Sequence, residues 1–173
     1  MNDYLGKKLN NIRVNNVLPF VNGKLLDVGC GLNKLVRAYN NGIGVDVYDF
    51  GDADLLVEDT SNLPFESESF DTITIIAALN HIPNRKDVVR ECHRLLKADG
   101  QVIITMLSPT ISRIWHKIRE PWDEDQKVRG MKEGEVFGMS KKEIMTIFSD
   151  SSFTLKSHKR FMLFLNSLYV FTK

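Results

Sequence analysis

Short apolar runs recur along the first part of the chain, with turn residues between them. Most of these runs are apolar almost throughout rather than at alternate positions, which is typical of strands in a parallel sheet covered by helices on both faces. The pattern therefore predicts a doubly wound, mostly parallel α/β sheet. The expected strands cover residues 24–28, 42–46, 53–57, 70–76 and 101–107.

Helical periodicity fills most of the gaps between these strands. The clearest helix is expected over residues 84–97, where five apolar residues share one face: Val88, Val89, Cys92, Leu95 and Leu96. Asn84 is the expected N-cap of this helix, and Asp99 with Gly100 is its expected end.

Three further helices are expected. Ser140-Lys-Lys-Glu143 matches a capping box that opens one of them, with Ile144, Ile147 and Phe148 as its buried stripe. The other two cover residues 32–39 and an amphipathic segment at 9–20. Only residues 47–52 lie between the second and third strands, so we expect a turn there rather than a helical crossover.

Composition supports one globular domain. The chain has 173 residues, of which 43% are hydrophobic, and it contains no internal repeat or linker-like stretch. We expect a single domain over residues 1–173, made of a helical N-terminal segment (1–23), a cofactor-binding core (24–107) and a C-terminal, acceptor-side part (108–173). The C-terminal part carries the basic residues, because Lys and Arg outnumber Asp and Glu 12 to 8 from Ile111 onward.

Several classes of protein are disfavoured. The net charge of +1 gives no overall attraction to nucleic acid or to an anionic membrane, and the 11-residue apolar stretch at 161–171 is too short to span a bilayer. The N-terminus has no apolar run of the kind that a secretory signal needs, and two cysteines make no disulfide framework. The histidines have no ligand spacing with either cysteine. We therefore expect a cytoplasmic protein with no metal site and no membrane span.

A glycine turn follows the first strand and carries the clearest candidate chemistry. Asp27 lies near the carboxyl end of this strand, just before Gly29 and Gly31, and glycine allows a ligand to approach the backbone closely. A dinucleotide fingerprint would need a third glycine at position 34, which is Lys34. Asp27 would also repel a pyrophosphate, whereas it suits a cationic amine or a hydroxyl. The turn therefore favours a positive or neutral ligand.

Two later aspartates extend this candidate site. Asp46 ends the second strand, 19 residues after Asp27, where a carboxylate can accept hydrogen bonds from both hydroxyls of a ribose. Asp59 follows the third strand and could accept from an exocyclic adenine amine, although aspartate also opens turns. The spacing is that of a nucleoside site.

In order and spacing, these residues resemble the class I S-adenosylmethionine-dependent methyltransferases, specifically the small type 11 methyltransferase domain related to enzymes of quinone biosynthesis. The resemblance covers residues 25–106. The matching pieces are Leu26-Asp-Val-Gly-Cys-Gly31, Gly44-Val-Asp46, Asp59 with Leu63-Pro-Phe65, Ser69-Phe-Asp71, residues 77–82 and Arg94-Leu-Leu-Lys-Ala-Asp-Gly100.

The resemblance implies S-adenosyl-L-methionine as cofactor, S-adenosyl-L-homocysteine as product, and a C-terminal antiparallel hairpin from strands near 153–158 and 167–172. It also implies the roles of individual residues. The methionine portion lies on Asp27, Gly29, Cys30 and Gly31, with Ala77 beside it; the ribose lies on Asp46; and the adenine lies against Val47, with Asp59 and Thr60 at its edge.

Two positions depart from the family pattern. Residue 33, often a third glycine, is Asn33, and the frequent Glu-His pair after the fourth strand is Asn80-His81. His81 is the candidate general base, and the alternative is a histidine that shapes a loop. Trp115, His116 and Trp122 follow the fifth strand and belong either to the core or to the acceptor pocket.

The predicted function is methyl transfer to a small-molecule acceptor, and three alternatives stay open. A nicotinamide-dependent oxidoreductase is disfavoured by Lys34 and Asp27. A non-catalytic cofactor-binding subunit and a nucleic-acid methyltransferase are the others, the last supported only by the basic C-terminal part. There, Lys156, His158, Lys159 and Arg160 form a basic cluster, which we interpret as a solvated strand end rather than a site for an anionic acceptor or nucleic acid. The oligomeric state is left open.

Overall fold

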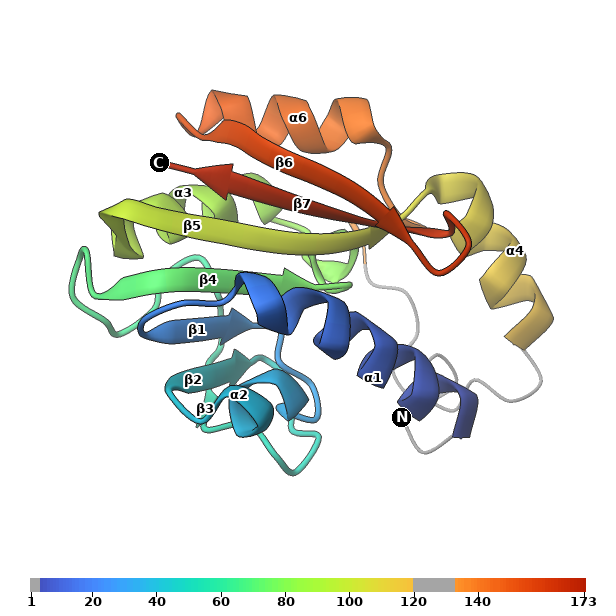
Figure 1. The fold of residues 1–173 in the computed structure, drawn as a ribbon, viewed down its shortest axis with the longest axis horizontal. Helices are drawn as coiled ribbons and strands as arrows, with labels where there is room; N and C mark the ends of the chain where they lie inside the picture. Colours follow the sequence, from blue (N-terminus) through green and yellow to red (C-terminus); the bar gives the residue numbers. More distant parts are fainter. Residues whose placement is uncertain (1–3, 120–132) are drawn as a thin grey trace.

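One mixed sheet organises the chain (Figure 1). The computed structural model describes residues 4–119 and 133–173, and within them seven strands lie in the order β3-β2-β1-β4-β5-β7-β6. The neighbouring pairs from β3 to β5 are all parallel, whereas β7 is antiparallel to both β5 and β6. The predicted doubly wound sheet and its antiparallel C-terminal hairpin are confirmed. The strands are β1 (Leu25–Val28), β2 (Gly42–Asp46), β3 (Leu55–Leu56), β4 (Phe70–Ile76), β5 (Leu96–Leu107), β6 (Thr154–Phe161) and β7 (Asn166–Thr172).

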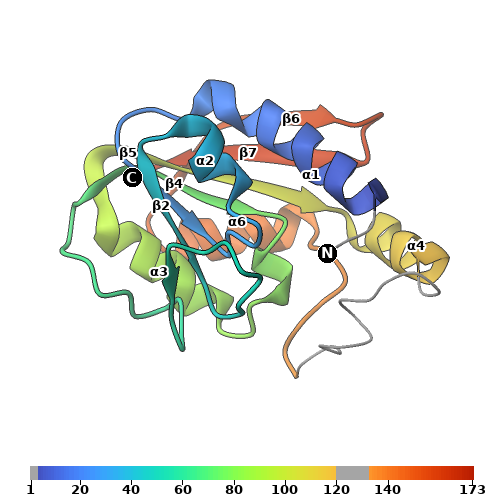
Figure 2. The same ribbon diagram turned by 90° about the horizontal axis from the view of Figure 1, so that it is seen from below.

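Helices cover both faces of this sheet (Figure 2). On one face lie α1 (Tyr4–Val17), the 3-10 turn η1 (Leu18–Phe20) and α2 (Lys34–Tyr39), which pack on buried residues such as Leu25, Ile103 and Val170. On the other face lie α3 (Arg85–Leu95) and α6 (Lys141–Asp150), which bury Val88 and Phe148 against the sheet. Because both faces are covered, the central strands are apolar along most of their length, as the sequence pattern indicated.

Local sequence explains several element boundaries. The Ser140 hydroxyl accepts from the Glu143 amide at 3.2 Å while the Glu143 carboxylate accepts from the Ser140 amide at 2.7 Å, so the predicted capping box opens α6. Ile144, Ile147 and Phe148 form its buried stripe. The link between β2 and β3 contains no helix, as its length predicted.

The helix predicted over 84–97 is shorter in the structure. It ends at Leu95, because Leu96 is fully buried, has an extended backbone and pairs with Phe70 at the start of β5. Asn84 occupies the N-cap position, yet its side chain makes no cap hydrogen bond and instead donates to Asp59. Both differences have the same cause: a contact with a distant part of the chain is stronger than the local helix signal.

Two parts of the chain were not anticipated as they are found. Helix α4 (Pro109–Arg119) follows β5 directly, and α1 begins at Tyr4 rather than near residue 9. α4 extends beyond the two helix layers at the end of the sheet where β4 and β5 finish (Figures 1 and 2). The aromatic residues considered for the acceptor side lie outside the described residues, since the description covers neither Trp122 nor the side chains of Trp115 and His116.

Candidate functional site

The strand order reverses direction at β1 and β4. From β1 the chain runs outward through β2 to β3, and it then crosses back to β4 and β5 on the other side of β1. The crevice beyond the carboxyl ends of strands at such a switch point is where open α/β sheets bind ligands. The segments that meet there are the glycine turn after β1, the end of β2 and the loop after β4.

The glycine turn adopts a conformation that only glycine takes easily. Gly29 and Gly31 have φ values of +70° and +53°. A Cβ on Gly29 would lie 2.7 Å from the Cβ of Ala78, so the turn packs tightly on the loop after β4. A Cβ on Gly31 would meet no atom within 4 Å, so this side of the turn faces open space.

Asp46 ties the end of β2 to this turn. Its Oδ2 accepts from the amide of Gly31 at 2.8 Å and its Oδ1 accepts from the amide of Tyr48 at 3.0 Å. A carboxylate has about four lone-pair positions, so two such bonds leave capacity for a ligand's hydroxyls. Val47, the next residue, has 51% of its surface exposed and offers an apolar face beside them.

Asp27 is buried at the centre of the same group. It lies level with Gly44 of β2 and Thr74 of β4, and its Oδ1 accepts from the Thr74 hydroxyl at 2.6 Å. Burial raises the pKa of Asp27 to about 7; the Thr74 hydrogen bond lowers it and the charge of Asp46 raises it further. A cation bound beside Asp27 would stabilise its ionised form, because it would offset both the desolvation of the carboxylate and its repulsion by Asp46.

The thiol of Cys30 has an environment that opposes its ionisation. Burial and then the charges of Asp27, Asp46 and Asp54 hold its pKa well above the usual range. A reactive cysteine needs the opposite setting, with nearby positive charge. Cys30 is therefore a small buried residue of the turn and is poorly suited to act as a nucleophile.

Asn33 explains why a third glycine is not required at its position. Its φ is +51°, in the left-handed region that asparagine tolerates best among residues with a side chain. The side-chain amide donates to the Asp52 carbonyl at 3.0 Å and to Asp54 Oδ2 at 2.8 Å. The Asp54 carboxylate also accepts from the Gly44 amide at 2.8 Å. The glycine turn is thus braced by the loop between β2 and β3.

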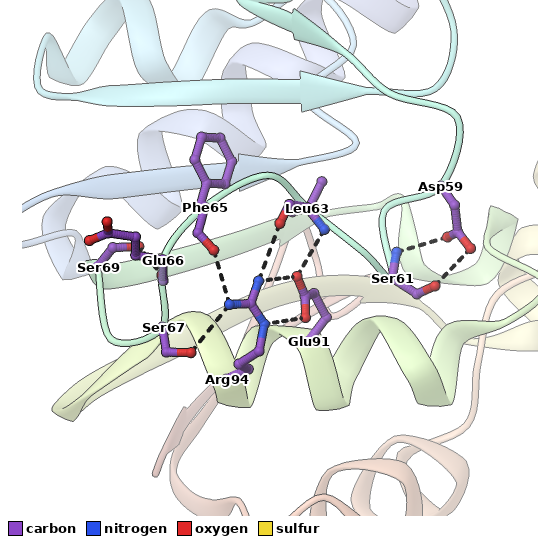
Figure 3. A network of polar contacts seen from close by, with 9 residues as sticks. All are labelled: Asp59, Ser61, Leu63, Phe65, Glu66, Ser67, Ser69, Glu91 and Arg94. Carbon is purple, nitrogen blue, oxygen red and sulfur yellow. Dashed lines mark hydrogen bonds and ion pairs between the residues drawn. The ribbon is translucent and has the colours of Figure 1, made fainter.

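Asp59 and Thr60 lie on the loop after β3, which an ion pair between the half-buried Arg94 and the buried Glu91 holds in place (Figure 3). Asp59 is exposed, and hydrogen bonds from Asn84 and then from Ser61 lower its pKa. Thr60 is buried. In the described residues Asp59 accepts hydrogen bonds from Ser61 and Asn84, and none joins it to the glycine turn.

The ion pair joins Glu91 and Arg94 of α3. The guanidinium of Arg94 donates to both Glu91 oxygens at 2.8 and 2.6 Å, and also to the carbonyls of Phe65 and Leu63 at 2.9 and 3.2 Å. Glu91 accepts from the Leu63 amide at 2.9 Å. Burial raises the pKa of Glu91, but the hydrogen bonds from Arg94 and Leu63 outweigh it, so the net shift is downward.

The loop after β4 presents the residues of the opposite side. Ala77 has φ +51°, which is unusual for alanine, and its amide donates to the Thr105 carbonyl. Four residues on, the Nδ1 atom of His81 lies 3.4 Å from Oε2 of Glu135, whose side chain is only 2% exposed. Glu135 belongs to the segment before α6 and was not singled out from the sequence.

Asn80 anchors the segment that carries Glu135. The side-chain amide of Asn80 donates to the backbone carbonyl of Val136 at 3.1 Å. The backbone amide of Val136 in turn donates to the backbone carbonyl of Asn80 at 2.9 Å. Nearby, Arg85 donates to the Gly134 carbonyl and the Met139 amide donates to the Leu107 carbonyl. These contacts bring residues 134–139 against the ends of β4 and β5, beside His81.

The comparisons with known proteins agree with this geometry. Residues 26–104, which contain the glycine turn, Asp46 and His81, match a family model described as a methyltransferase domain. This part of the chain is thus similar to the type 11 family of class I methyltransferase domains. The match begins at β1 and ends within β5.

Two curated relatives share part of the chain's sequence. A demethylmenaquinone methyltransferase of Thermotoga maritima is 41% identical over 68 residues, covering 39% of this chain and 30% of that protein. A ubiquinone biosynthesis O-methyltransferase of Pseudomonas fluorescens is 32% identical over 121 residues, covering 58% and 52%. The chain therefore spans about half or less of the length of these relatives.

A solved structure extends the likeness in fold to the C-terminal hairpin. An S-adenosylmethionine-dependent methyltransferase of Thermotoga maritima, described as a possible histamine N-methyltransferase, superposes with a TM-score of 0.72. The superposition covers 93% of this chain and 87% of that one, at 17% identity. The whole arrangement of the chain, including β6 and β7, is thus a known variant of the Rossmann-like fold.

Proposed function

We propose that the chain transfers the methyl group of S-adenosyl-L-methionine to a small-molecule acceptor. The supporting observation is the pair of buried carboxylates, Asp27 and Asp46, at a glycine turn whose Gly31 side faces open space. Such a site suits a cationic nucleoside, because the carboxylates repel a phosphate and attract an ammonium or sulfonium group.

The proposed orientation of the cofactor follows from the positions of these residues. Asp27, Gly29, Cys30 and Gly31 hold the methionine portion, with Ala77 on its other side. Asp46 accepts from the ribose hydroxyls while keeping its bond from the Gly31 amide. Val47 lies against the adenine, and Asp59 with Thr60 lies at the adenine edge.

Bound cofactor supplies an activated methyl group on a sulfonium. In the transfer, a lone pair of the acceptor forms a bond to the methyl carbon, the carbon–sulfur bond breaks, and its electron pair stays on sulfur to give S-adenosyl-L-homocysteine. The protein's main task is to hold acceptor and methyl in line, and positioning of this kind can lower a barrier by about 7 to 11 kcal/mol. A nucleophilic residue is not required.

His81 is the proposed general base for an acceptor hydroxyl. It follows β4 at the end of the sheet where the methyl would lie, and the buried carboxylate of Glu135 orients its Nδ1 side. The Nε2 atom then takes the proton that the hydroxyl loses as the new bond forms. Glu135 acts as a positioning residue in place of the family's adjacent glutamate.

We further propose a phenol or a reduced quinone ring as the class of acceptor. The support comes from the two relatives, one a demethylmenaquinone methyltransferase and the other a ubiquinone biosynthesis O-methyltransferase. A phenolic hydroxyl also needs a general base, which agrees with the paired His81 and Glu135.

The test is turnover with labelled S-adenosyl-L-methionine, using catechol and menadiol as acceptor probes, together with calorimetric titration of S-adenosyl-L-homocysteine. Asp46→Ala should weaken binding by about ten- to hundredfold, because it removes hydrogen bonds to a charged group. Asp49→Ala is the matched control, since Asp49 is exposed on the same loop and bonds only the Gly51 amide. Equal affinities for the two variants would reject the ribose assignment, and binding without transfer to either probe would favour a non-catalytic subunit.

The base is tested separately. His81→Gln should lower kcat by about 10²- to 10⁴-fold with little change in product affinity. Glu135→Gln should lower kcat less and should move the acidic limb of the pH profile. A uniform loss of activity at every pH would instead mean that Glu135 only supports the loop.

A further inference from the structure

The turn between β6 and β7 exposes apolar side chains at the end of the hairpin. We call residues 162–165, with the sequence Met-Leu-Phe-Leu, the hairpin tip. Leu163 is 90% exposed, Phe164 70% and Leu165 42%. Burial of a leucine or phenylalanine is favourable, so three neighbouring exposed apolar side chains are typical of an interaction surface.

The backbone of the hairpin tip holds these side chains outward. Met162, Leu163 and Phe164 have φ values of +53°, +53° and +66°, a left-handed run that glycine or asparagine would adopt more easily. The Leu165 amide closes the turn by donating to the Met162 carbonyl at 3.1 Å. Apolar residues thus occupy positions where turn chemistry favours small polar ones.

The strands beside the hairpin tip carry only positive charge. Residues 153–173 contain four Lys or Arg residues and no Asp or Glu, although the whole chain is nearly neutral. Lys156, Lys159 and Arg160 of β6 are exposed, and none forms an ion pair within the part of the chain that the structure describes. A partner for this surface must therefore accept apolar side chains and supply negative charge around them.

The hairpin tip lies at the same end of the molecule as the candidate site. Asn166 pairs with Leu107, so the tip begins beside the carboxyl end of β5. Both ribbon views place the tip, α4 and the first turns of α1 at this end (Figures 1 and 2). α1 and α4 also contain no acidic residue, and Ile114 of α4 is 56% exposed.

We propose that this end of the molecule docks on the surface of an anionic lipid bilayer. Leu163, Phe164 and Leu165 enter the interfacial layer, while Lys159 and Arg160, at the tip end of β6, lie among the headgroups. None of the described helices is long and apolar enough to cross a membrane, so the contact is peripheral. The proposal does not depend on methyl transfer, because it concerns a surface and not the site.

Vesicle sedimentation with the full chain tests this docking. One set of vesicles is phosphatidylcholine alone and the other contains about 30% phosphatidylglycerol, at low salt, where charge attraction is strongest. Binding is expected only to the anionic set. Leu163→Gly with Phe164→Gly should weaken it by about tenfold or more, because it removes the inserted groups while glycine suits the positive φ values.

Two further variants separate charge from apolar contact. Lys159→Ala and Arg160→Ala should each weaken binding by about fivefold. Leu56→Ser and Arg90→Ala are the matched controls, since Leu56 is half exposed on β3 at the opposite edge of the sheet and Arg90 is exposed on α3. Both controls should bind as the parent protein does.

Three results would overturn the proposal. One is an absence of sedimentation with anionic vesicles at low salt. Another is unchanged binding of the double glycine variant. The third is a dimer, seen by light scattering and lost in the double glycine variant, in a protein that does not bind vesicles, because the tip would then serve a second copy of this chain.

Discussion

Asn33 and Asn80, the two departures from the family pattern, each use a side-chain amide to join segments that are distant in sequence. Asn33 binds Asp54 across 21 residues and Asn80 binds Val136 across 56 residues. Glycine at position 33 would give the same backbone conformation without the bond to Asp54. Asn33 therefore has a side-chain contact where the family often has a flexible glycine. Asn80 likewise has a side-chain contact where the family often has a glutamate.

A first prediction at the residue scale concerns Asp27 and stability. Its pKa is about 7 in the folded protein against an ordinary value of 3.8, so the folded state binds the proton more tightly than the unfolded state does. The free energy of unfolding should therefore fall as the pH rises from about 4 to about 7, by about 4 kcal/mol from this group, and stay level above that. Urea titrations across this range should show a flatter profile for Asp27→Asn, and identical profiles would contradict the assignment.

The same aspartate predicts how ligand affinity depends on pH. A cationic amine needs Asp27 ionised, so affinity for S-adenosyl-L-homocysteine should rise by up to about tenfold per pH unit between about 5 and 7. Binding at pH 6 should release a proton, which calorimetry in buffers of different ionisation enthalpy measures directly. Asp27→Asn should release none.

At the scale of elements, α3 supports the loops of the candidate site through side chains near both of its ends. Arg94 and Glu91 fasten residues 63–67 to the helix, as the dashed contacts of Figure 3 show, and this fixes where the loop passes Asp59. The pieces around Leu63 and Arg94 contribute to the family resemblance because they form one contact. Neither piece carries chemistry by itself.

Removing Arg94 should cost more than removing its neighbour on the same helix. Arg94→Ala leaves the Glu91 carboxylate buried without its guanidinium, and should lower the free energy of unfolding by about 1 to 3 kcal/mol. Arg90→Ala breaks only an exposed pair with Asp87 and should cost less than about 1 kcal/mol. Urea unfolding of the two variants measures this difference. Similar free energies of unfolding would show that the contacts of Arg94 with Glu91 and the loop add no stability.

For the whole molecule, the order of strands brings the candidate site together. The glycine turn, Asp46 and the loop after β4 meet only because β2 and β4 flank β1. The antiparallel β7 adds the hairpin to the far edge of β5 and directs its tip toward the same end. One end of the sheet thus holds both the proposed cofactor site and the proposed lipid surface.

A thermal shift tests the proposed cofactor at this scale. A ligand at 100 times its dissociation constant adds about 2.7 kcal/mol, which corresponds to a rise in Tm of about 5 to 11 °C for a chain of this length. S-adenosyl-L-methionine and S-adenosyl-L-homocysteine should give this rise. NAD should not, and a shift with NAD alone would restore the oxidoreductase alternative.

Most elements could be predicted from the sequence because their signals are local. The period of apolar positions marks strands and helices, and a capping box needs only four residues, so α6 and the apolar central strands were found as expected. The prediction was wrong where a tertiary contact outweighed a local signal. Leu96 pairs with Phe70 in the sheet instead of continuing α3, and the Asn84 side chain donates to Asp59 instead of capping the helix. α4 was missed altogether.

The sequence by itself determined the fold class, the glycine turn and the carboxylates at the strand ends, since these follow from chain periodicity and the conformational freedom of glycine. The tertiary structure decided which side chains meet. Glu135 lies beside His81 across 54 residues, and Leu63 bonds to Glu91 across 28. It also decided which apolar residues stay in solvent at the hairpin tip. Such contacts depend on how packed elements orient distant parts of the chain, and no local pattern encodes that orientation.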